Sequence, residues 1–124
     1  MGDIRLSIDR GLLSRALENV ISNAFRYSPD GGLVRMSASV VVAEAFLDID
    51  DQGPGIPQAE RERVFEPFYR GSAAGGASGE GTGLGLYIAR SIVRGHGWTI
   101  EAGESPECGG RIRIRMPIGG KHEA

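Results

Sequence analysis

The sequence has little of what would tie it to an oxidising compartment, a membrane or a nucleic acid. It contains one cysteine, Cys108, so an internal disulfide is impossible. No apolar run approaches the roughly 20 residues that span a bilayer, and no apolar signal segment follows Met1. The formal charge of −2 gives no basic field to attract nucleic acid. We therefore expect a cytoplasmic domain that contacts neither membrane nor nucleic acid.

The chain length and the distribution of glycine bear on domain count and on the position of functional loops. The 124 residues suit one domain over 1–124, with a frayed, polar tail at 119–124, and we expect it to be monomeric when isolated. The 20 glycines gather around 53–55 and 71–85 and are not spread evenly. Such clustering between well-patterned segments indicates loops that serve a ligand.

Hydrophobic periodicity and turn residues predict an α/β (α+β) chain. Apolar residues at helical spacing, with Asp9 as the cap, predict the first helix, and Pro29 should end it. The expected helices are 9–28, 57–64 and 84–96, and the expected strands are 34–40, 47–50, 98–102 and 111–116, the first two strands joined near 43–45. This order fits a two-layer sandwich, with about three helices on one face of a mixed, mostly antiparallel sheet.

A polar edge on the first helix is the first candidate site. Asn19, Asn23, Arg26 and Tyr27 fall within an arc of roughly 100° beside the apolar face. Carboxamides, a cation and an aromatic ring could coordinate magnesium, neutralise phosphate and cover a nucleobase. Taken alone, the same residues are more typical of an ordinary polar surface than of a binding site.

Two loops complete the set of candidates. Asp51, Gly53, Gly55 and Ile56 follow a strand, so the backbone can approach a ligand and the carboxylate can accept a hydrogen bond from an exocyclic amine. The second loop opens a helix with closely spaced N–H groups suited to phosphate: Gly81, Thr82, Gly83, Leu84, Gly85 and Leu86. It is neither a P-loop nor a dinucleotide fingerprint.

Together, the ordered motifs resemble the ATP-binding catalytic domain of bacterial two-component sensor histidine kinases. Segment 19–27 is similar to their N box, 51–56 to the G1 box, 64–70 to the F box and 81–86 to the G2 box. The resemblance implies a Bergerat-type ATP-binding fold with ATP and Mg²⁺ as ligands. It implies that Asn23 binds the magnesium ion, with Asn19 supporting it.

The resemblance also implies roles for the other residues. Tyr27 would lie against the adenine, Asp51 would bind its amino group, and Gly53, Gly55 and Ile56 would form its pocket. Arg26 and Arg70 would meet phosphate, as would the backbone of 81–86. Phe65 and Phe68 would anchor the base of a lid, or simply serve as core aromatics.

The partners follow from the same resemblance. A helical dimerisation module of the same kinase would carry the phosphoacceptor histidine and the general base, so no catalytic base is assigned within this chain. A response regulator would act through the parent protein, and whether that parent is anchored in the inner membrane stays open. Two alternatives remain: an anti-sigma-factor serine kinase, and a nucleotide-binding regulatory domain without catalysis.

Three features depart from the family pattern or invite another interpretation. Segment 71–78 lacks the basic residues that many relatives place in the lid. Gly109 and Gly110 match a third glycine box only loosely, so we expect no ligand role there. Alternating arginines at 111, 113 and 115 could bind an anionic partner, but a solvated strand face is the preferred interpretation.

Overall fold

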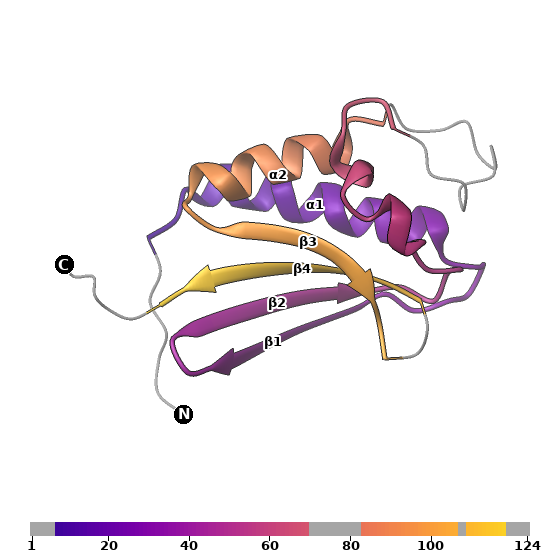
Figure 1. Cartoon of the computed structure of the whole chain (residues 1–124), viewed down its shortest axis with the longest axis horizontal. Coiled ribbons are helices and arrows are strands. Elements are labelled where there is room, and N and C mark those ends of the chain that lie inside the picture. Colours follow the sequence, from indigo (N-terminus) through magenta and orange to yellow (C-terminus); the bar gives the residue numbers. More distant parts are fainter. Residues whose placement is uncertain (1–6, 70–82, 107–108, 119–124) are drawn as a thin grey trace.

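Two α-helices pack on one face of a four-stranded sheet, with the helix layer above the sheet in Figure 1. This computed structural model describes residues 7–69, 83–106 and 109–118. Helices α1 and α2 lie against each other, so residues far apart in the sequence meet at both ends of the helix pair. The predicted two-layer α/β architecture is therefore confirmed.

Helix α1, Arg10–Tyr27, forms where the sequence predicts it. The Asp9 side chain accepts a hydrogen bond from the Leu12 N–H at 3.0 Å and caps the first turn. Ser28 has extended backbone geometry, as expected for a residue before proline. The helix buries Ala16, Val20 and Ala24. Phe25 continues the apolar spacing of the helix, but 57% of it is exposed.

Every strand pairing among the described residues is antiparallel, which confirms a mostly antiparallel sheet; no parallel pair occurs in this part of the chain. Its strands are β1 (Arg35–Val41), β2 (Glu44–Asp50), β3 (Thr99–Glu104) and β4 (Gly110–Pro117). They lie in the order β1-β2-β4-β3. This order places the end of β2 beside the start of β4, with Asp50 opposite Arg111.

The segment between β2 and the second α-helix differs from its prediction. In place of one helix over 57–64, there are two 3₁₀ turns, Gln58–Glu60 and Arg63–Phe65, labelled η1 and η2. Each turn closes i→i+3 hydrogen bonds, the pattern of a short 3₁₀ segment. Helix α2, Gly85–Gly95, lies within the predicted 84–96. The described residues thus form two α-helices where about three were expected.

The inner face of the sheet builds the core with the helices. The largest fully buried side chains are those of Phe65, Ile49, Ile114, Val20 and Val93. They come from both layers and from the turn η2, so that turn is fixed against the core even though it is not an α-helix.

The outer face of the sheet carries a ladder of ion pairs. Arg111 binds Asp50 and Arg113 binds Asp48 through two hydrogen bonds each, at 2.7 and 2.9 Å. Arg115 lies 3.2 Å from both Glu44 and Glu101. The hydrogen bond to Asp50 raises the pKa of Arg111 above its ordinary value, although partial burial opposes this. Because these arginines are paired within the domain, we discard the idea that they serve an anionic partner.

Among the described residues, neither helix combines the length and apolarity needed to cross a membrane.

Candidate functional site

The carboxylate of Asp51 is held at the seam between two strands. It directly follows β2, and its Oδ1 accepts hydrogen bonds from the N–H groups of Gly53 at 2.8 Å and Gly110 at 3.0 Å. Its backbone N–H donates to the Gly110 carbonyl at 3.0 Å, which extends the pairing of β2 with β4. Within the described part of the chain Oδ2 accepts no hydrogen bond, so one carboxylate oxygen orients the group and the other is available to a ligand.

Glycines around Asp51 permit unusually close backbone packing. A Cβ at Gly53 would collide with the carbonyl of Tyr27, and one at Gly109 would collide with the carbonyl of Asp51. A Cβ at Gly110 would lie 3.0 Å from Asp51 Oδ2 and 3.4 Å from Ile56 Cγ1. Gly109 and Gly110 therefore belong to this site through packing and a backbone hydrogen bond.

Sequence reasoning assigned no role to Gly109 and Gly110. The signal that could have found them is the glycine pair just before the alternating β4, because antiparallel pairing of β2 with β4 puts that pair beside Asp51.

The loop after Asp51 is fixed by side chains from neighbouring segments. Gly55 has a φ of 88°, which favours glycine. Arg61 donates from Nε to the Ile56 carbonyl at 3.0 Å, and Gln52 Oε1 accepts from the Leu33 N–H at 3.0 Å. These contacts join the loop to the turn after α1 and to η1, so its shape does not depend on a ligand.

The polar residues of α1 lie along the helix edge as expected, although they are not all equally placed. Asn19 and Asn23 are half-buried, whereas Arg26 is exposed and donates to Asn23 Oδ1 at 3.4 Å. Asn19 Nδ2 is buried and has no hydrogen-bond partner among the residues that the structure describes. Because an unpaired buried amide costs about 1–3 kcal/mol, this donor is a marked feature of the site.

The start of α2 lies directly against Asn19. A Cβ on Gly85, the first residue of α2, would lie 3.8 Å from Asn19 Cβ and 4.0 Å from its Cγ. The unpaired amide thus lies beside the N-terminus of α2, where free N–H groups and the helix dipole favour an anion. Leu86 is buried in the core, so only its backbone can face a ligand.

Phe68 and Gly83 form a close backbone junction before α2. The Phe68 N–H donates to the Gly83 carbonyl at 2.8 Å, and both residues have positive φ, 66° and 78°. A Cβ on Gly83 would lie 2.7 Å from Phe68 Cα, so glycine is required there. Phe65 is buried in the core, whereas 71% of Phe68 is exposed. The interpretation of both as core aromatics is therefore wrong for Phe68.

Three predicted phosphate-binding residues, Arg70, Gly81 and Thr82, lie outside the described residues. The remaining candidates form two clusters at one end of the helix pair. Asp51, Gly53 and Ile56 gather near the end of α1 at Tyr27, and Asn19 meets the start of α2. An acceptor and a phosphate-type cradle thus flank the same stretch of α1, an arrangement suited to a nucleotide.

Comparison with known proteins places this fold and site in a family. Residues 8–120 match the family described as "Histidine kinase-, DNA gyrase B-, and HSP90-like ATPase". The chain belongs to this family.

Its relatives include sensor histidine kinases. It is 38% identical to the sensor histidine kinase TmoS of Ectopseudomonas mendocina, with 90% of this chain and 12% of that protein covered. It is 39% identical to WalK of Bacillus subtilis, with 93% and 19% covered. The chain thus spans less than a fifth of either relative's length.

Solved structures give the same result. The mycobacterial sensor histidine kinase MprB has a TM-score of 0.82 and 38% identity, covering 90% of this chain and 76% of that one. The ATP-binding domain of PrrB from Mycobacterium tuberculosis has a TM-score of 0.72 and 30% identity, covering 94% and 74%.

Proposed function

We propose that this chain binds ATP with Mg²⁺ and serves as the catalytic domain of a sensor histidine kinase. The observation that carries the proposal is that two polar groups without a hydrogen-bond partner among the described residues, one acceptor and one donor, lie beside α1. Asp51 Oδ2 is an oriented acceptor at one side, and Asn19 Nδ2 is a buried, unpaired donor at the other. The resemblance to PrrB, whose solved domain is described as ATP-binding, supports the same ligand.

The base would bind beside Asp51. Oδ2 can accept a hydrogen bond from the adenine amino group, because Oδ1 already receives the Gly53 and Gly110 N–H groups. Tyr27 would lie against the ring, and Ile56 would line the pocket. Gly53 and Gly55 would leave room for the base. A guanine would present a carbonyl oxygen to Oδ2, so we expect adenine to be preferred.

The phosphates would bind at the start of α2. Asn19 Nδ2 would donate to a phosphate oxygen, and this hydrogen bond would remove the free-energy penalty of burying the amide without a partner. Backbone N–H groups of Gly83, Leu84 and Gly85 lie where an anion is favoured, and Arg26 would add positive charge.

The residues present also fit a magnesium ion that is held mainly by phosphate. Among the described residues, no three of His, Cys, Asp and Glu gather into a metal site. Magnesium usually keeps waters and binds through one or two protein oxygens plus phosphate oxygens, so Asn23 Oδ1 would suffice as a protein ligand. The ion would neutralise charge on the phosphate that is transferred.

The phosphate would pass to a histidine on a helical module of the parent protein. This chain's part would be to orient the γ-phosphate and neutralise its charge, the main contributions to phosphoryl transfer. His96 does not suit the acceptor role, because Nε2 accepts from the Asp9 N–H and Nδ1 contacts the Ile92 carbonyl, both at 2.9 Å. His122 lies outside the described residues. A response regulator would then receive the phosphate from the parent.

Nucleotide titration by calorimetry tests the binding proposal. We expect magnesium-dependent ATP binding that Asn23→Ala weakens at least tenfold, through loss of the metal ligand. Ser14→Ala, an exposed change on the same helix, serves as the control and should leave the affinity unchanged. Equal affinities for wild type and Asn23→Ala would overturn the assignment of the metal site.

Phosphotransfer needs a separate test. The domain is mixed with labelled ATP and a separately purified helical module of a sensor kinase. We expect acid-labile phosphate on that module and almost none without it. Acid-stable phosphoserine on a partner would instead favour the anti-sigma-factor alternative, and ATP binding without any transfer would favour the regulatory one.

A further inference from the structure

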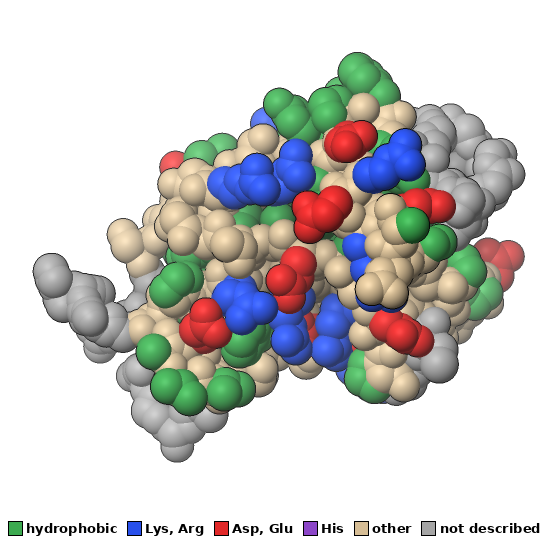
Figure 2. Space-filling model, in the orientation of Figure 1, with side chains coloured by type: hydrophobic (Ala, Val, Ile, Leu, Met, Phe, Trp, Pro, Cys, Tyr) green, Lys and Arg blue, Asp and Glu red, His purple; other side chains and the backbone are tan. Residues whose placement is uncertain are grey.

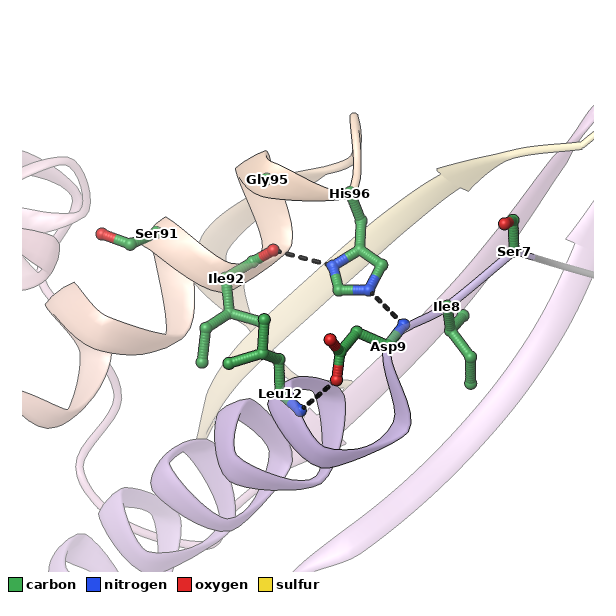
Figure 3. Close-up of a pocket in the computed structure, with 8 residues that line it drawn as sticks. All are labelled: Ser7, Ile8, Asp9, Leu12, Ser91, Ile92, Gly95 and His96. Atoms are coloured by element: carbon green, nitrogen blue, oxygen red, sulfur yellow. Dashed lines mark hydrogen bonds between the residues drawn. The ribbon is translucent and has the colours of Figure 1, made fainter.

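A groove lies at the other end of the helix pair, between the start of α1 and the end of α2 (Figure 3). Its volume is about 580 Å³. Ile8, Leu12 and Ile92 supply its apolar part, and Ser91, Gly95 and His96 line it further. We call these six residues the distal groove. Leu12 is seven residues before Asn19, so about two helical turns separate this groove from the proposed phosphate site.

The distal groove is held in shape by one hydrogen bond that joins the two helix ends and by one within each of them. His96 bridges the Ile92 carbonyl and the Asp9 N–H, and the Asp9 carboxylate caps α1 through the Leu12 N–H, as drawn in Figure 3. The His96 ring also stacks on Trp98, with centroids 4.7 Å apart. Little ordering is then needed on binding, which reduces its entropic cost.

Apolar side chains in the groove are only partly used by the fold. Ile8 and Leu12 are 42% and 45% exposed although each contributes to the lining. The side chains of Ser91 and Gly95 are small and leave the α2 wall of the groove open. A Cβ at Gly95 would meet nothing within 4 Å. The groove can therefore accept side chains from outside.

Charge around the groove selects the kind of partner. The two helices carry five arginines, of which Arg26 lies at the nucleotide end of α1 and Arg90 lies over the Phe65 ring. The other three are Arg10, Arg15 and Arg94. Figure 2 shows arginine side chains over this helix layer. Arg15 and Arg94 follow Leu12 and Ser91 by three residues, so each shares a helix face with a groove residue.

These two arginines differ from those of β4. Arg111, Arg113 and Arg115 are all paired with acids, whereas Arg15 and Arg94 are exposed and make no ion pair with any described residue. One carboxylate, that of Asp9, lines the groove, where its Oδ1 accepts the Leu12 N–H; the two arginines outnumber it. Positive charge at the rim is thus available to an outside acid.

We propose that the distal groove binds an amphipathic helix of a partner protein, with apolar side chains in the groove and carboxylates facing Arg15 and Arg94. A helix suits the space between two packed helices because its side-chain ridges can enter such a groove. The surface is separate from the nucleotide site, so the domain can hold both ligands at once.

Two synthetic peptides of about four helical turns test the proposal. Both carry leucines at i, i+3, i+4 and i+7; glutamates flank this face in one peptide and lysines in the other. We expect the glutamate peptide to shift the NMR amide signals of Leu12, Ser91 and Gly95 but not that of Gly53. Equal binding of the lysine peptide, no binding of either peptide, or shifts confined to the Asp51 loop would overturn the proposal.

Matched variants distinguish the contribution of the rim charge to peptide binding from the contribution of the apolar groove. Arg94→Gln should weaken binding of the glutamate peptide about threefold, as for a rim charge, and Arg35→Gln on β1 should leave it unchanged. Ser91→Trp should block the groove and abolish binding. All three variants should keep wild-type ATP affinity, so failure of this proposal is distinguishable from failure of the proposed function. Wild-type peptide affinity in both Arg94→Gln and Ser91→Trp would also overturn it.

Discussion

Gly110 donates its backbone N–H to Asp51 Oδ1 at 3.0 Å across 59 positions of sequence. The same oxygen accepts the Gly53 N–H at 2.8 Å. Two donors on one oxygen fix the rotation of the carboxylate and leave the other oxygen facing a prospective ligand. The backbone N–H groups of Gly53, in the loop, and Gly110, at the start of β4, set the orientation of the carboxylate. This orientation therefore exists before a nucleotide binds.

Asp51→Asn should distinguish the role of Oδ2 in ligand binding from the role of Oδ1 in holding the loop. The amide oxygen can keep the two N–H groups, which leaves the amide nitrogen, a donor, where adenine offers its own donor. We expect ATP affinity to fall about five- to 150-fold, the effect of an unmade polar contact of about 1–3 kcal/mol. Calorimetric titration measures it. Asp30→Asn in the exposed turn is the control, and unchanged affinity in Asp51→Asn would refute the role of Oδ2.

The glycine pair before β4 should be intolerant of a single methyl group. In Gly110→Ala the new Cβ would lie 3.0 Å from Asp51 Oδ2, so we expect several-fold weaker ATP binding. Gly109→Ala would collide with the Asp51 carbonyl, and unfolding free energy should fall by about 2 kcal/mol or more.

Gly103→Ala is the matched control for both glycine variants, because its Cβ would meet nothing within 4 Å. Thermal and denaturant unfolding, together with nucleotide titration, distinguish the two effects. If Gly110→Ala and Gly103→Ala bound ATP equally, Gly110 would have no part in the site.

The ion-pair ladder should show how burial decides the strength of a pair. Asp48 is 5% exposed and receives two hydrogen bonds from Arg113, while Arg111 lies 3.6 Å from its Oδ2. Arg113→Ala would remove both hydrogen bonds from a buried carboxylate and cost about 3 kcal/mol, the lower end for a broken buried pair because Arg111 remains. Arg115→Ala should cost less than about 1 kcal/mol, because its partners Glu44 and Glu101 remain largely solvated. Urea unfolding of the two variants gives the comparison, and equal costs would contradict it.

The pH dependence of this ladder follows from the sign of the arginine shift. The hydrogen bond to Asp48 raises the pKa of Arg113 above its ordinary value. A raised pKa in the folded state means that the stabilisation is complete below the ordinary value and is lost only as pH rises through the raised one. The cost of Arg113→Ala should therefore stay constant from neutral to mildly alkaline pH, measured by urea unfolding. A cost that shrank over this window would contradict the pairing.

Some elements could be predicted from sequence because local signals and burial agree there. The Asp9 cap, the apolar spacing and Pro29 together define α1, and strict alternation of arginine with apolar residues defines β4. Leu84 to His96 similarly predicts α2, because one apolar stripe ends at Gly97.

Other features depend on contacts that no local pattern encodes. Segment 57–64 has helical residues, but the burial of Phe65 fixes it as two short turns. Phe25 continues the apolar spacing of α1 past the point where the sheet and α2 cover it. Gly109 and Gly110 gain their role only when β4 pairs with β2. The sequence therefore predicts Asp51 as a site residue but not the two glycines that hold it in place.

The β1–β2 turn gives a prediction with the opposite sign. Val41 pairs with Glu44, which leaves a two-residue loop of Val42 and Ala43, and Val42 has a φ of 55° with 94% exposure. A β-branched residue is strained at such an angle by about 1–3 kcal/mol, and two-residue turns of this kind favour glycine.

Val42→Gly should therefore stabilise the domain. Relief of strain outweighs the roughly 0.4–1 kcal/mol that glycine adds to the entropy of the unfolded chain, for a net gain on the order of 1 kcal/mol. Thermal unfolding should show a midpoint raised by about 3–5 °C. Val41→Gly, inside the strand, should lower the midpoint instead, because glycine weakens a strand without relieving strain. ATP affinity should not change in either variant, since the turn lies at the end of β1 away from Asp51. A lower midpoint for Val42→Gly would mean that the left-handed backbone at Val42 carries no strain.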